Sequence, residues 1–167
     1  MTLLTDMSND RKIPKILIDA MADPLWPRGR ISGLQLRHLN PRISGFEFEL
    51  LQTREQLLRN DLADTETLIR FEESPKIRDF LALAAGTKCG HKVELPILDV
   101  EQILVIGGGT DWADDVWVAL DFRAGFGDPQ VVFNQFSNKS CEWLVIAKSF
   151  SEFCRAIGIS VMAERQS

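Results

Sequence analysis

The chain has 167 residues, of which 45% are hydrophobic and 26% are charged, with a formal net charge of −5. These values predict one globular domain over residues 1–167, a size at which roughly 70% of the unfolded surface becomes buried. The negative charge argues against nucleic-acid binding, which needs clustered Lys and Arg. Neither a long apolar run nor a signal-peptide pattern is present, so we expect a cytoplasmic protein without a membrane partner.

The first 45 residues are the least regular part of the chain. Prolines at positions 14, 24 and 27 interrupt this region. They allow at most a short helix at about residues 14–22, which we expect to be followed by an extended segment fixed by Trp26.

Residues 46–50 alternate apolar and acidic side chains, which predicts a short strand or extended arm with one apolar face. Glu47 and Glu49 share the other face. Exposed acids on an edge strand are a common protection against aggregation, and the same two residues are a candidate acidic strip for a partner. They could in principle also flank a scissile bond, as the two acids of a glycosidase do.

Three further helices are expected before the central glycines. Thr53 and Gln56 form a capping-box pattern that predicts a helix at about 53–60. Ser74-Pro75 predicts a second start, with a helix over about 75–85 that ends at Gly86. One buried face of that helix is indicated by the spacing of Ile77, Phe80, Leu81 and Ala84. Residues 99–102 predict the start of a short third helix that runs to the glycines.

Gly107, Gly108 and Gly109 precede a cluster of aspartates. A phosphate-binding loop is not indicated, because no lysine follows the glycines and they lead into a predicted strand. A calcium loop is not indicated either, because Asp111, Asp114 and Asp115 lack the spacing and the distal glutamate of an EF-hand. We therefore expect a solvated turn whose aspartates cap neighbouring backbone, and no metal or other cofactor.

After residue 115 the pattern changes to short runs rich in Val, Trp and Phe, at 116–122, 131–136 and 142–147. Their short connections predict antiparallel pairing. A second capping box, at 149–152, predicts a last helix that ends at Gly158. Helices followed by an antiparallel meander and a C-terminal helix indicate the α+β class, with the helices at 75–85 and 149–157 packed on the sheet.

No catalytic residues are assigned, and we expect a protein that is not an enzyme. The two histidines, His38 and His91, have no nucleophile placed beside them in a catalytic pattern. The three cysteines are widely spaced and odd in number, which favours buried free thiols over a disulfide framework. They are Cys89, Cys141 and Cys154.

The four tryptophans are the more informative aromatic residues, and most of them are expected in the core. Trp112 differs because it lies among Asp111, Asp114 and Asp115. An exposed tryptophan within a polar rim is a typical anchor of a protein interface. The alternative is that Trp112 folds inward and the aspartates only cap a turn. The candidate partner-binding residues are thus these four together with Glu47 and Glu49.

The order of elements in the last third resembles the Smi/Knr homology domains of the SUKH superfamily. The runs that carry the resemblance are DDVWVALDFR (114–123), GDPQVVF (127–133), CEWLVIAKSF (141–150) and SEFCRAIG (151–158). They match a Gly/Asp turn, a strand ending in an Asp-aromatic-Arg element, a Pro-Val strand, a Trp-containing strand and a final helix. With LNPRISGFEFELLQTREQL upstream, the resemblance covers about residues 39–158 as a core preceded by an irregular N-terminal arm. The region between 60 and 95 matches poorly.

The resemblance implies a single α+β domain that binds another protein. Bacterial members are mostly immunity proteins that neutralise cognate toxins, and fungal relatives are regulatory scaffolds of cell-wall synthesis. It therefore implies an immunity protein with a basic toxin domain as one candidate partner, or a regulatory scaffold of the same fold. A small hydrolase is the least favoured alternative. The sequence leaves the partner's identity and the oligomeric state open.

Overall fold

The structure is a computed structural model that describes residues 13–59, 102–109, 116–137 and 140–161, with only the backbone described over 135–137 and 140–142. The expected helix at 75–85 lies outside these residues. So do its Ser74-Pro75 start and Gly86 end.

The architecture is α+β, as the order of elements predicted. Within the described residues, six antiparallel strands form one sheet in the order β1-β2-β3-β4-β5-β6. Each strand pairs with the next along the chain. The strands are β1 (Ile31–Ser32), β2 (Glu47–Leu50), β3 (Ile103–Gly109), β4 (Trp117–Asp121), β5 (Gln130–Ser137) and β6 (Ser140–Ala147). The antiparallel pairing predicted for the last three runs is confirmed.

The strand at β2 is also confirmed, and its side chains alternate between exposed glutamates and buried apolar residues. Its expected position at a sheet edge is wrong, because β2 lies between β1 and β3. The two-residue β1 was too short to leave a periodic signal in the sequence, and it protects β2 from becoming the edge.

The prediction of a short helix from about residue 99 to the glycines is wrong. Residues 103–109 form β3, which pairs with β2 on one side and β4 on the other. The first four residues of β3 are Ile103, Leu104, Val105 and Ile106, which favour a strand. The glycines therefore belong to a strand rather than to a turn. At Gly107 this strand approaches β2 closely, because a Cβ atom there would lie 2.5 Å from the Glu49 carbonyl oxygen.

The short first helix is confirmed as α1 (Lys15–Ala22), which begins directly after Pro14. Two 3₁₀ helices follow, η1 (Gly33–Leu36) and η2 (Pro41–Gly45). The helix expected at 53–60 is present over residues 54–59. Its capping box is reciprocal: the Gln56 amide donates to Thr53 Oγ1, and the Thr53 amide donates to Gln56 Oε1, both at 3.2 Å.

The last helix, α4 (Phe150–Ala156), has defined caps at both ends. Ser149 Oγ accepts from the Glu152 amide at 3.1 Å, while the Glu152 carboxylate accepts from the Lys148 amide at 2.8 Å. Gly158 ends the helix with φ of 87°, as predicted, in a conformation that glycine adopts without strain. The Ile159 amide then donates back to the Cys154 carbonyl at 2.8 Å, which is the hydrogen bond of a Schellman motif.

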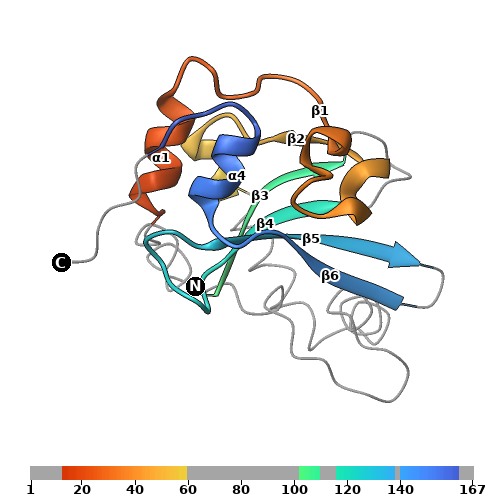
Figure 1. The fold of residues 1–167 in the computed structure, drawn as a ribbon. Helices are drawn as coiled ribbons and strands as arrows, with labels where there is room; N and C mark the ends of the chain where they lie inside the picture. The colour runs from red at the N-terminus through yellow and green to blue at the C-terminus, as the bar shows by residue number, and fades with distance from the viewer. Residues whose placement is uncertain (1–12, 60–101, 110–115, 138–139, 162–167) are drawn as a thin grey trace.

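The main hydrophobic core fills the space between one face of the sheet and the helices α1 and α4, which lie side by side on that face (Figure 1). Trp26 is buried there as expected. Its ring packs on Phe150 at a centroid distance of 6.5 Å, and its Nε1 donates to the Leu51 carbonyl at 3.1 Å. Trp117 and Trp143 are partly buried, and Trp112 lies outside the described residues.

The second face of the sheet carries a smaller buried cluster of Ile103, Ala119 and Val132. Alternation along the strands places Asp121 and Asn134 on this face as well. They are the two buried polar residues of the described chain.

Candidate functional site

The register of β2 and β3 places Glu47 and Glu49 near the end of the sheet at which β3 ends. Phe48 pairs with Gly109 and Glu49 pairs with Gly108, so Glu47 lies beside the point at which β3 ends. The chain continues from Gly109 into residues 110–115 and re-enters the described structure at Val116. The Gly109 amide donates to the Val116 carbonyl at 2.7 Å, so both attachment points of this six-residue segment are adjacent.

We call Glu47, Glu49 and residues 110–115 the acidic end. The positions of Asp111, Trp112, Asp114 and Asp115 lie outside the described residues. The structure does place Gly109, the residue from which that segment begins, next to β2. Sequence reasoning had no means of relating the two groups, since more than fifty residues separate them along the chain.

The glutamates of the acidic end are both exposed and project from the face opposite the main core. Arg30 Nη1 lies 3.6 Å from Glu47 Oε2, with both side chains more than half exposed. Such surface pairs contribute little to stability, because water and salt screen them. Glu49 has no ion-pair partner among the residues that the structure describes. This strip therefore keeps negative charge available to a partner.

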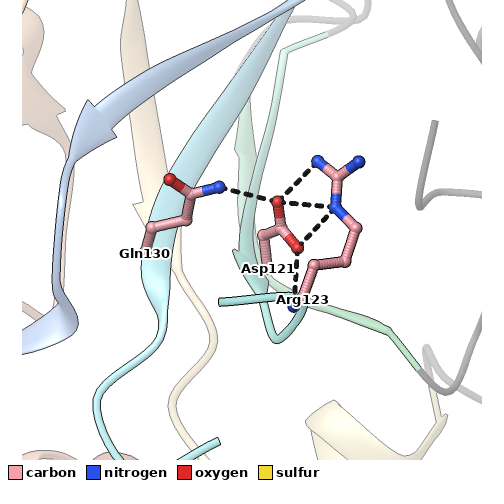
Figure 2. Close-up of polar contacts among 3 residues, drawn as sticks. All are labelled: Asp121, Arg123 and Gln130. Atoms are coloured by element: carbon pink, nitrogen blue, oxygen red, sulfur yellow. Dashed lines mark hydrogen bonds and ion pairs between the residues drawn. The ribbon is translucent and has the colours of Figure 1, made fainter. Parts of the chain in front are cut away.

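A second polar cluster lies near the opposite end of β4, and sequence reasoning assigned it no role. Asp121 is the last residue of β4, and its side chain is fully buried. It accepts hydrogen bonds from the Arg123 backbone amide at 3.0 Å, from Arg123 Nε at 3.0 Å and from Arg123 Nη2 at 2.7 Å. Gln130 Nε2 from β5 donates to the same carboxylate at 2.8 Å (Figure 2). Two sequence signals mark this cluster: an aspartate at the end of an otherwise apolar strand, where aspartate is disfavoured, and the Asp-aromatic-Arg element noted in the resemblance.

Burial alone raises the pKa of Asp121, but the hydrogen bonds from Arg123 and Gln130 outweigh it and hold the pKa below its ordinary value. The same pairing raises the pKa of Arg123. Asp121 is therefore ionised at neutral pH despite its burial. The cluster is a charged pair whose acid is inside the protein and whose base is half exposed.

Cys154 is the one cysteine whose side chain the structure describes, and it is a buried free thiol as expected. Burial raises its pKa to about 12, and the charges of Asp128 and Asp23 add to this effect. A thiol with such a pKa is a poor nucleophile, because the thiolate is the reactive form. Cys89, His91 and the Cys141 side chain lie outside the description, and His38 is exposed.

Within the described ranges, no three His, Cys, Asp or Glu side chains gather as a metal-binding group. In the same part of the chain, no helix has both the length and the apolar character required to cross a bilayer.

Comparison of the chain with protein-family models, with curated proteins and with solved structures finds no match. The resemblance to Smi/Knr homology domains stays a prediction.

Proposed function

We propose that the protein is a non-enzymatic protein-binding module that uses the acidic end to bind a basic partner. The observation that carries the proposal is the pairing of Phe48 with Gly109, which sets the exposed glutamates of β2 beside the origin of residues 110–115. Gly109, after which the sequence continues into the acidic residues 110–115, thus lies at the same end of the sheet as these glutamates.

Charge and apolar contact have separate roles in such a surface. Clustered carboxylates accelerate the approach of a basic partner, whereas final affinity depends on a few desolvated anchors. Trp112, which lies between Asp111 and Asp114 in the sequence, is the aromatic anchor in this proposal. Glu47, opposite Ser32 of β1, and Glu49, opposite Gly108 of β3, form the part of the surface that lies on the sheet.

The finer proposal follows from the family resemblance: the protein is a bacterial immunity protein of the SUKH superfamily, and the basic partner is its cognate toxin domain. A regulatory scaffold of the same fold is the alternative. The acidic end serves either role, because both require a stable complex with another protein. The partner to test first is a basic protein encoded immediately upstream.

The experiment is titration calorimetry of that protein with the wild type and three variants. Glu49→Lys, Asp111→Lys and Trp112→Ala should each weaken binding by about 1 kcal/mol or more, roughly fivefold in Kd. Circular dichroism and thermal unfolding of Glu49→Lys should match the wild type, because Glu49 is exposed. The same two measurements on Asp111→Lys and Trp112→Ala separate loss of binding from loss of folding.

Asp19→Lys is the matched control, because Asp19 is exposed on α1 and the variant makes the same change in charge. The α1 region lies toward the other end of β2, since Trp26 bonds to Leu51 beyond the C-terminus of that strand. Binding that is unchanged in all three test variants would show that the interface lies elsewhere. Absence of any complex with the basic protein would reject that partner.

A further inference from the structure

The buried carboxylate of Asp121 fixes the direction of the Arg123 side chain. A guanidinium group has two edges that can each hold a carboxylate with two parallel hydrogen bonds. Asp121 occupies the side edge, formed by Nε and Nη2. Gln130 holds Asp121 from the neighbouring strand, so the acceptor is itself fixed.

The end edge of the same guanidinium, formed by Nη1 and the second hydrogen of Nη2, has no partner among the described residues. The Arg123 side chain is 51% exposed, whereas that of Asp121 is fully buried. Figure 2 shows Nη1 pointing away from the carboxylate. A long, flexible side chain is thus held in one direction with two donors available. This preorganisation lowers the entropy cost of binding a further acceptor.

We propose that Arg123 is a binding site for a single carboxylate, held in place by Asp121. A carboxylate matches the spacing of the free donors, as it does at the occupied edge. A phosphate group fits less well, because it would add up to two negative charges to a pair that Asp121 already makes neutral, whereas a carboxylate adds only one. The carboxylate can come from a Glu or Asp side chain of a peptide or from a chain terminus.

The site is separate from the acidic end and does not depend on the proposed function. Val116 precedes β4 at the acidic end, whereas Asp121 ends the strand at the other end. The Arg123 loop is also anchored by two hydrogen bonds to other parts of the chain. The Phe122 amide donates to the Gln102 carbonyl at 2.8 Å, and Asp128 Oδ2 accepts from Ser151 Oγ at 2.6 Å.

The test is a nuclear magnetic resonance titration that follows the Arg123 Nε–Hε signal of the full chain. Three probes are used: a terminally blocked Leu-Glu-Leu peptide, the blocked Leu-Gln-Leu peptide, and Leu-Gln-Leu with a free C-terminus. A saturable shift with the blocked Glu peptide and not with the blocked Gln peptide is expected. A response to the third probe alone would assign the carboxylate to a chain terminus. Equal shifts with all three, or no shift with any, would overturn the proposal.

Variants separate binding from a purely structural role. Arg123→Lys keeps the charge but removes the planar fork, and should weaken binding of the carboxylate probe by about fivefold or more. Arg155→Lys, on the exposed last turn of α4, is the matched control and should leave binding unchanged. Binding to Arg123→Lys is followed by the backbone amide signals of residues 122–125, and an affinity equal to that of the wild type would contradict the proposal. If the variant fails to fold, the comparison of probes on the wild-type chain still decides.

Discussion

At the scale of single residues, the two buried polar side chains on the second face of the sheet have different structural roles. Asn134 on β5 accepts from the Trp117 amide, so its side chain joins the end of β4 to β5. Asp121 instead holds a charge that burial disfavours, and hydrogen bonds from Arg123 and Gln130 offset that cost. Removing such an acceptor leaves donors that the surrounding structure has positioned for it.

Asp121→Asn should therefore lower the free energy of unfolding by roughly 1–3 kcal/mol at neutral pH. The folded-state pKa of Asp121 is lowered, so its contribution is fully present above the unfolded-state pKa of about 4 and is lost as pH falls through the folded value. Urea unfolding at about pH 7 and about pH 3 measures the difference, which should shrink at the lower pH as the wild type becomes protonated.

The exposed Asp19→Asn is the control for this prediction, because the Lys15–Asp19 pair lies on the surface and should contribute less than about 0.5 kcal/mol. A difference between wild type and Asp121→Asn that stays constant with pH would contradict the role assigned to the ionised carboxylate.

At the scale of elements, local signals in the sequence predicted well wherever a short pattern decides the structure. Thr53 with Gln56, and Ser149 with Glu152, each marked a helix start that the structure contains. Gly158 marked the helix end. These features depend on contacts between residues a few positions apart, which a single sequence displays directly.

The prediction of secondary structure was wrong where a strand pairs with a partner strand that lies far away in the sequence. Gly107–Gly109 looked like the end of a helix followed by a turn, because glycine is disfavoured inside strands. In the fold, β2 approaches so closely at Gly107 that a side chain would strike its backbone. The pairing of β2 with β3, and with it one end of the candidate site, depends on this approach. No local pattern reports it.

Gly107→Ala should consequently destabilise the protein by about 1–3 kcal/mol, since the added Cβ would lie 2.5 Å from the Glu49 carbonyl oxygen, a backbone atom that cannot move alone. Gly45→Ala is the control, because a Cβ there meets nothing within 4 Å and φ is not positive. Thermal unfolding of both variants measures the contrast. Equal melting temperatures would show that β2 and β3 can separate at little cost.

At the scale of the whole molecule, the sheet and the helices form one layered unit in which the β2 glutamates and the Asp121–Arg123 pair lie toward different ends of the sheet. The apolar side chains of β2 face the main core, so its glutamates necessarily face outward. Alternation along residues 46–50 predicted that division from sequence. The direction of the acidic end relative to the rest of the protein follows only from the complete strand order.

The whole-molecule charge supplies a last prediction, which rests on the proposed function. If a basic partner approaches the acidic end, its association rate should fall steeply with salt while its dissociation rate changes little, because screening shortens the reach of charge from about 10 Å at 0.1 M to about 3 Å at 1 M.

Glu49→Lys and Asp19→Lys both change the net charge from −5 to −3, since one negative charge is replaced by one positive charge. Glu49→Lys should reduce the salt dependence of the association rate much more than Asp19→Lys, because steering depends on where the charge lies. Stopped-flow mixing over a range of salt concentrations measures both rates. An equal effect of the two variants would mean that net charge, rather than the acidic end, governs the encounter.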